Sequence, residues 1–231
     1  MATDRPHVLF AFAPTLDTHD RFFNTYPSSL LHAIAPAVAA MDAGNLEASY
    51  CGRIYHPKVF TREAETLWRT MLAREEPTHV AISSTYDSWH IALTLSQVVR
   101  ELLPEAVVIH GGPHLDEVLE PFVLKRTPSL DPLAEGAERL ADFMVGGDGE
   151  YALSWLLEAT SGCCGPVAAR AAVAARSEEI SALPGTGHMV FRHQDQRWSM
   201  RFRNRLELDK LPFVPRHLLP AEDLLSTAAE N

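Results

Sequence analysis

Two apolar runs that each end in a pair of glycines constrain most strongly what this chain can fold into. The runs lie at residues 107–110 and 142–145, and two glycines follow each of them directly. Short apolar runs bounded by turn residues are typical of buried parallel strands. Glycine at a strand end lets a large ligand approach the backbone, because no Cβ stands in the way. The two runs therefore predict neighbouring strand ends that together border a ligand.

Apolar runs alternate with helical patterns along the first 150 residues. Helices are predicted at residues 29–41, 61–74 and 89–103, and strands at residues 7–13, 46–54, 78–84, 106–110 and 142–145. Pro36 predicts a kink in the first helix or an early end to it. This alternation indicates an α/β fold with a doubly wound (Rossmann-like), five-stranded parallel sheet. In such a sheet ligands bind outside the carboxyl ends of the strands.

The character of the chain changes near residue 160, so we predict a division into residues 1–160 and 161–231. The first part is the Rossmann-like domain. The second begins with a small-residue loop and continues with a β-hairpin, whose strands are predicted at residues 188–192 and 198–202. It ends in an extended, proline-containing linker at residues 208–215.

Composition excludes several classes of partner. The formal net charge of −10 argues against nucleic acid or an anionic membrane as the main partner. No segment is long enough to span a bilayer, and the amino terminus lacks the pattern of a secretion signal, so we expect a cytoplasmic protein. The three cysteines, Cys51, Cys163 and Cys164, form no disulfide framework, and the histidine spacing argues against a structural zinc site.

Four motifs, in order, resemble the N-terminal cobalamin-binding domain of cobalamin-dependent radical S-adenosylmethionine enzymes. A Ser-Ser-Thr-Tyr loop at residues 83–86 follows a strand, and Gly-Gly-Pro-His at residues 111–114 follows another. Gly-Asp-Gly-Glu at residues 147–150 stands where the family often has Gly-Glu-Gly-Glu. The Leu-Pro segments at residues 183–184 and 211–212 flank the hairpin and resemble the bridge to the radical domain. The similarity extends over about residues 8–219.

The resemblance implies a set of cofactor contacts at strand ends and in the loops after them. Glycine backbone N–H groups would meet the phosphate and amides of the cobalamin tail, and the serine-rich loop would lie beneath the corrin ring. The implied cobalamin-binding residues are Pro14, Thr15, Ser83, Ser84, Thr85, Tyr86, Gly111, Gly112, Pro113, His114, Gly146, Gly147, Gly149 and Glu150.

Residues 17–22 resemble the Asp-x-His-x-x-Gly motif that ligates cobalt in other cobalamin proteins, which makes His19 the candidate axial ligand. Phe22 stands where that motif has glycine, and the family commonly binds cobalamin without a histidine ligand. A solvated loop histidine is the alternative interpretation of His19.

The resemblance implies a module that supports methyl transfer through methylcobalamin. The Cys-x3-Cys-x2-Cys motif of the radical domain is absent, so S-adenosylmethionine and a [4Fe–4S] cluster would belong to a radical domain in cis or in trans. On this interpretation the chain alone is not catalytic. A stand-alone cobalamin carrier or sensor is the alternative, while a dinucleotide enzyme is disfavoured because no Gly-x-Gly-x-x-Gly follows the first strand.

Overall fold

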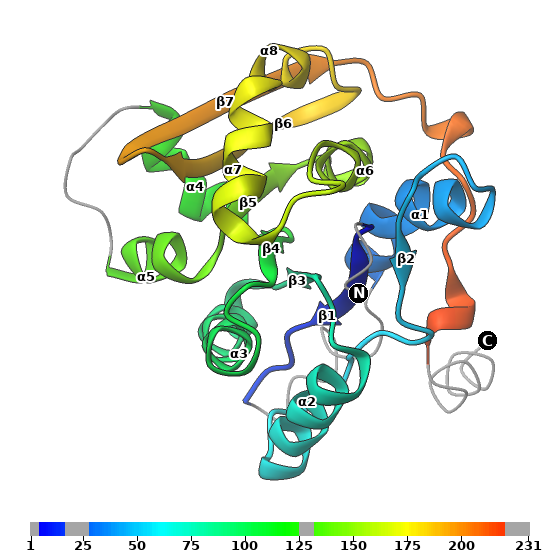
Figure 1. Ribbon diagram of the computed structural model, residues 1–231, viewed down its shortest axis with the longest axis vertical. Coiled ribbons are helices and arrows are strands. Elements are labelled where there is room, and N and C mark those ends of the chain that lie inside the picture. Colours follow the sequence, from blue (N-terminus) through cyan, green and yellow to red (C-terminus); the bar gives the residue numbers. More distant parts are fainter. Residues whose placement is uncertain (1–4, 17–27, 125–131, 220–231) are drawn as a thin grey trace.

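A single mixed sheet of seven strands, in the order β2-β1-β3-β4-β5-β6-β7, organises the fold (Figure 1). The structure is a computed structural model that describes residues 5–16, 28–124 and 132–219. The parallel strands are β1 (His7–Phe12), β2 (Ser49–Tyr50), β3 (His79–Ser83), β4 (Val107–Gly111) and β5 (Phe143–Gly147). The predicted α/β class with a largely parallel sheet is therefore confirmed.

The hairpin belongs to this same sheet, which has seven strands rather than the five expected. Its strands are β6 (Gly185–His193) and β7 (Gln196–Asn204). β6 lies antiparallel to β5, with Phe191 opposite Phe143 and Gly187 opposite Gly147. The prediction counted only strands that alternate with helices, whereas β6 reaches the edge of the parallel sheet after three consecutive helices.

Helices cover both faces of the sheet (Figure 1). One face carries α1 (Ser28–Asp42), α6 (Glu150–Ala159), α7 (Gly165–Ala175) and α8 (Ser177–Ile180). The other carries α2 (Arg62–Glu75), α3 (Trp89–Leu102), α4 (Leu115–Leu124) and α5 (Pro132–Leu140). Two apolar cores result, one on each side of the strands. In the described part of the chain, none of the helices combines the length and apolar character needed to cross a bilayer.

A local signal accounts for the start of α2, whereas the proline in α1 and the expected second strand behave differently from the prediction. The Thr61 side chain accepts a hydrogen bond from the Ala64 N–H at 3.2 Å, which caps α2 close to the predicted start. The first helix runs through the buried Pro36 and reaches residue 42, so the proline does not shorten it. The second strand, expected over residues 46–54, is reduced to two residues.

One expectation for the carboxyl-terminal part needs correction. Residues 165–175 form α7, not a loop, because alanine favours helix and Pro166 lies in the first turn, where proline is tolerated. The expected linker returns past α1 to β2 (Figure 1). There Leu218 is buried, and its carbonyl accepts a hydrogen bond from the Ile54 N–H at 3.0 Å. Leu218 lies just beyond the expected linker, so the chain packs against the fold again directly after residues 208–215, whereas Phe213 within the linker is fully exposed.

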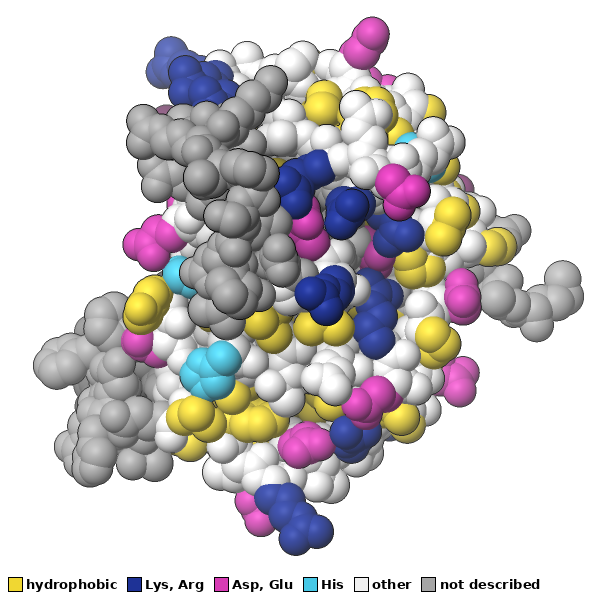
Figure 2. Space-filling view, turned by 90° about the vertical axis from the view of Figure 1, so that its left-hand side faces the viewer, with side chains coloured by type: hydrophobic (Ala, Val, Ile, Leu, Met, Phe, Trp, Pro, Cys, Tyr) yellow, Lys and Arg dark blue, Asp and Glu magenta, His cyan; other side chains and the backbone are white. Residues whose placement is uncertain are grey.

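The outward face of the hairpin is basic although the whole chain is acidic. Arg197, Arg201 and Arg203 alternate along β7 and are exposed, and Arg192 lies opposite Arg197 on β6. Glu138 of α5 neutralises part of this charge through an ion pair with Arg197. Figure 2, which views the molecule from the left of Figure 1, shows Lys and Arg side chains gathered near the middle of that view.

Candidate functional site

The strand order places a switch point between β1 and β3. The chain builds β2 on one side of β1 and then crosses to place β3, β4 and β5 on the other side. This is the flavodoxin-like order, in which the loops after the first and third strands diverge and leave a crevice at the carboxyl edge. Within the described residues, the loops after β1, β3, β4 and β5 all begin at this edge.

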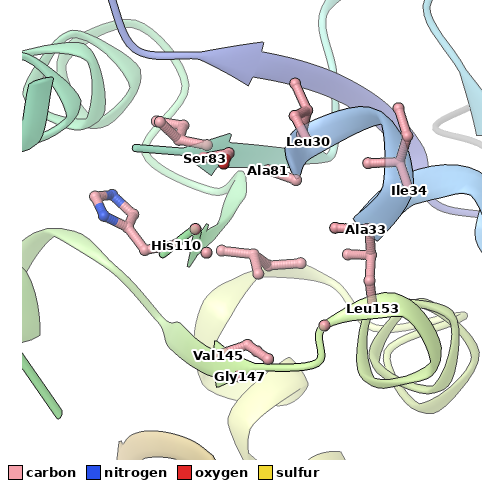
Figure 3. Close-up of a pocket in the computed structure, with 14 residues that line it drawn as sticks. Leu30, Ala33, Ile34, Ala81, Ser83, His110, Val145, Gly147 and Leu153 are labelled. Carbon is pink, nitrogen blue, oxygen red and sulfur yellow. The ribbon is translucent and has the colours of Figure 1, made fainter. Parts of the chain in front are cut away.

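A cavity of about 70 Å³ lies at that edge, between the sheet and helices α1 and α6 (Figure 3). Leu30, Ala33 and Ile34 of α1 face Val145 and Leu153 across it. Its lining is mostly apolar: Leu30, Ala33, Ile34, Ala81, Ile82, Ser83, Ile109, His110, Gly111, Gly112, Val145, Gly147, Gly149 and Leu153. The cavity has room for a small apolar group, and a larger ligand would extend out over the strand ends.

Both glycine clusters border this cavity, as expected for adjacent strands. Gly111 and Gly112 come from the end of β4, and Gly147 and Gly149 from the end of β5 and the loop after it. Gly147 has φ +80°, and a Cβ there would stand 2.2 Å from the carbonyl oxygen of Thr186 on β6. Gly147 is therefore required by strand packing, whatever ligand binds.

The serine-rich loop divides between the two faces of the sheet. Ser83 is buried and lines the cavity, and its carbonyl accepts a hydrogen bond from the Ala13 N–H at 2.9 Å. Ser84 is fully buried, and its Oγ has no hydrogen-bond partner among the described residues. Thr85 precedes a short 3-10 turn, and its N–H donates to Ser88 Oγ at 3.0 Å. Tyr86 is 72% exposed.

Aromatic rings pack edge to face beside this loop, on the α3 side. The Trp89 ring lies 5.4 Å from that of His110 and 5.6 Å from that of His114, and Tyr86 contacts His114 at 5.0 Å between centroids. His110 turns away from α1 (Figure 3), and its Nε2 lies 2.6 Å from Ser96 Oγ. Burial lowers the pKa of His110 to about 3, so the ring is neutral near pH 7.

Three further buried atoms in this group lack hydrogen-bond partners within the described ranges, namely Trp89 Nε1, His110 Nδ1 and His114 Nδ1, although the last lies 3.3 Å from Glu117 Oε2. An unsatisfied buried polar atom costs roughly 1–3 kcal/mol. Neither Trp89 nor His110 is among the residues predicted from the sequence to bind cobalamin. His110 could have been noticed as a histidine inside an otherwise apolar run. A buried imidazole needs hydrogen-bond partners that such a run does not supply.

Two hydrogen bonds join the loop after β5 to the hairpin. The Asp148 N–H donates to the Thr186 carbonyl at 2.9 Å, and Asp148 Oδ2 accepts from the Thr186 N–H at 2.8 Å. Glu150 then begins α6 with Oε2 buried and without a hydrogen-bond partner in the described structure. Burial is the main cause that raises the pKa of Glu150. Gly146 packs beneath Asp116, whose Oδ1 would stand 2.8 Å from a Cβ there.

The structure brings some of the selected residues to the cavity and leaves others apart. Ser83, Gly111, Gly112, Gly147 and Gly149 line it. The others stand at the same edge without lining it: Pro14, Thr15, Ser84, Thr85, Tyr86, Pro113, His114, Gly146 and Glu150. The backbone of Thr15 is fixed by a hydrogen bond in which the Phe60 N–H donates to the Thr15 carbonyl at 2.9 Å. His19 lies outside the described residues.

A scan against models of known protein families finds no match to this chain, and a search of curated proteins finds no relative. The resemblance to cobalamin-binding domains therefore stays a hypothesis based on short motifs.

Proposed function

We propose that this chain binds cobalamin at the carboxyl edge of its sheet and serves methyl transfer by a radical S-adenosylmethionine enzyme. The observation that carries the proposal is the apolar cavity between α1, α6 and the sheet, because glycines of both clusters line it. The cavity accepts one edge of the base that ends the nucleotide tail, while the rest of the base and the corrin ring lie outside, over the loops that follow the strands.

The lining suits the chemistry of that tail. The tail ends in a flat, weakly polar aromatic base, and Leu30, Ile34 and Leu153 supply apolar contacts for such a group. A Cβ at Gly111 or Gly149 would approach no atom beyond the chain neighbours more closely than 3.8 Å, so a ligand can reach the backbone there. Ser83 offers a hydroxyl inside the cavity.

The unsatisfied polar atoms at the same edge also support a polar ligand. Ser84 Oγ is buried without a hydrogen-bond partner in the described residues, and the ring of amide groups around a corrin offers many partners. When bound as methylcobalamin, the cofactor supplies a transferable methyl group. The role of this chain is to hold the tail, orient the ring and exclude water. S-adenosylmethionine and a [4Fe–4S] cluster would bind to a radical domain in cis or in trans.

Titration of the purified chain with hydroxocobalamin tests the proposal. We expect one equivalent of corrin to co-elute with the protein in gel filtration. Ala33→Leu should weaken binding at least tenfold because it fills the cavity. Ala39→Leu, on the same helix but away from the cavity lining, should bind as the wild type does. A folded wild-type chain that takes up no corrin would overturn the proposal.

A second measurement separates binding from methyl transfer. The cobalamin-loaded chain is supplied with a radical S-adenosylmethionine partner and a low-potential reductant that converts the bound corrin to cob(I)alamin. Transfer of the labelled methyl group from S-adenosylmethionine to cobalt, with S-adenosylhomocysteine as the leaving product, is then followed. Labelled methylcobalamin is the expected product. Tight binding with no methylation by any such partner would favour a carrier or sensor and would contradict the enzymatic part of the proposal.

A further inference from the structure

Three metal-binding side chains from distant parts of the sequence meet near the amino-terminal end of β1. His7 begins β1, Cys51 follows β2, and Glu75 ends α2. One ligand atom from each lies within 4.8 Å of the other two, and this is the only such group of three among the described residues. The cluster lies at the end of β1 opposite to the cobalamin cavity, so it is independent of the proposed function.

Two of the three distances between the ligand atoms are close to those of a tetrahedral centre, and the third lies within 4.8 Å. His7 Nε2 stands 3.5 Å from Cys51 Sγ and 3.9 Å from Glu75 Oε2. Zinc bonds of about 2.3 Å to sulfur and about 2.1 Å to nitrogen or oxygen place neighbouring tetrahedral ligand atoms about 3.4–3.6 Å apart. The first distance already satisfies this geometry. The second needs a movement of about half an ångström.

Neighbouring groups orient two of the three ligands. His7 Nδ1 lies 2.9 Å from Ser49 Oγ, a contact that directs Nε2 toward the cluster. Glu75 uses its other oxygen, Oε1, to accept the Arg74 Nε–H at 2.7 Å, which leaves Oε2 toward His7. A metal-bound histidine usually has this kind of outer partner, because the partner fixes the tautomer and the ring orientation.

The burial pattern leaves a fourth position open to solvent. Cys51 is buried, whereas the side chains of His7 and Glu75 are 27% and 22% exposed. Water can therefore reach the centre of the cluster from the side of the two exposed ligands. Three protein ligands with one open position is the arrangement of catalytic zinc sites rather than of closed structural ones.

We propose that His7 Nε2, Cys51 Sγ and Glu75 Oε2 bind one Zn²⁺ ion, with water as the fourth ligand. A thiolate with an imidazole favours zinc over Mg²⁺ or Ca²⁺, which prefer oxygen ligands alone. The Cys51 thiol gives up its proton to solvent as the zinc–sulfur bond forms. The bound ion links β1, the loop after β2 and the end of α2, so it also stabilises this side of the sheet.

Cobalt substitution tests this site directly. The full chain is stripped with a chelator and titrated with Co²⁺, whose thiolate charge-transfer band and intense d–d bands report sulfur ligation and tetrahedral geometry. We expect one equivalent with both signatures, displacement of Co²⁺ by Zn²⁺, and a higher Tm with Zn²⁺ than without it. Cys51→Ser should lose the charge-transfer band, and His7→Gln should weaken binding at least tenfold.

The controls use residues outside the cluster. A Cys163→Ala/Cys164→Ala double variant removes the other two thiols and should keep the complete cobalt spectrum. Ser49→Ala keeps all three ligands and should weaken binding about tenfold through the loss of the outer contact. His7→Gln covers the case in which the buried Cys51 variant does not fold, because His7 is partly exposed. A folded wild-type chain that binds Co²⁺ without the thiolate band, or equally well after His7→Gln, overturns the site.

Discussion

Gly112 packs against the backbone of Ser84 so closely that no other residue type fits. A Cβ at Gly112 would stand 2.3 Å from the Ser84 carbonyl oxygen and 2.7 Å from its nitrogen. The φ angle of Gly112 is +108°, which side chains rarely adopt. This contact ties the end of β4 to the loop after β3 and shapes one wall of the cavity.

Gly112→Ala should lower the free energy of unfolding by roughly 2 kcal/mol or more, because the clash is with backbone and the φ is positive. Gly111→Ala is the matched control. Its Cβ would meet only the Val145 carbonyl oxygen, at 3.9 Å, and should cost less than about 1 kcal/mol. Urea unfolding measures both, and equal losses would contradict the structural assignment.

Asp142→Asn should be strongly destabilising, by roughly 3 kcal/mol, because it leaves two partly buried arginines without the counter-charge of the buried Asp142. Asp142 Oδ2 accepts from Arg100 Nη2 at 2.7 Å and from the Val108 N–H at 2.8 Å, and Oδ1 pairs with Arg170. Glu47→Gln is the control.

Glu47 pairs with Arg5, and these side chains are 71% and 66% exposed, so its loss should change the unfolding free energy by less than about 1 kcal/mol. Chemical denaturation of both variants at pH 7 gives the comparison. Comparable losses in the two variants would show that the buried Asp142 network contributes no more to stability than an exposed ion pair.

The stability of the fold should decrease as the pH falls below about 6.5. Burial lowers the pKa of His79 to about 4 and, as the main cause, that of His110 to about 3. The unfolded chain binds protons at both residues near pH 6.5, whereas the folded chain does not. Each histidine therefore lowers the free energy of unfolding by about 1.4 kcal/mol per pH unit as the pH falls from 6.5, and neither changes it above that pH.

Comparison of variants isolates one of these histidines. Between pH 6.5 and 5, His110→Leu should reduce the slope of unfolding free energy against pH by about 1.4 kcal/mol per unit, whatever its effect at pH 7. His90→Gln, on the exposed side of α3, should leave the slope unchanged. An unaltered slope in His110→Leu would mean that its imidazole is protonated in the folded state.

Glu150→Gln should be at least as stable as the wild type at pH 7. Burial raises the pKa of Glu150, so the wild type is most stable below the ordinary carboxyl pKa and loses stability as the pH rises through the raised value. The difference between variant and wild type should therefore vanish near pH 4. Urea midpoints at pH 7 and pH 4 measure it.

Glu63→Gln provides a control of opposite sign in the first turn of another helix. Hydrogen bonds from its own backbone N–H and from Thr61 lower the pKa of Glu63, so its charge stabilises the fold above the ordinary carboxyl pKa. This variant should be less stable than the wild type at pH 7, with the difference again lost at low pH. If both substitutions changed the free energy of unfolding in the same direction at pH 7, the contrast between the partly buried Glu150 and the exposed Glu63 would be contradicted.

Local sequence signals predicted most of the regular structure. The apolar runs and their glycine ends marked β4 and β5, and Thr61 marked the start of α2, because strands and helix caps depend on neighbours in the chain. The same signals misjudged residues 165–175, where small residues suggested a loop. Alanine is a strong helix former. The burial of Ala169 and Val173 in α7 depends on tertiary contacts, which the local sequence does not show.

The candidate site was predictable only in part. Adjacent glycine-ended strands predicted a shared edge, and the cavity lies there. The contribution of α1 was not predicted, because Leu30 and Ile34 look like ordinary core positions in a helical pattern. Gly112 and Gly147 were selected as ligand contacts, whereas contacts with Ser84 and Thr186 already require them to be glycine.

The sequence by itself determined the α/β class, the order of the elements along the chain and the position of the glycine-ended strands, because these follow from periodicity and turn chemistry. Only the tertiary structure decided that β6 extends the sheet beside β5 and that Leu218 returns to β2. It alone brought His7, Cys51 and Glu75 together. Such contacts join residues far apart in the chain, and they form only when both apolar faces of the sheet are buried.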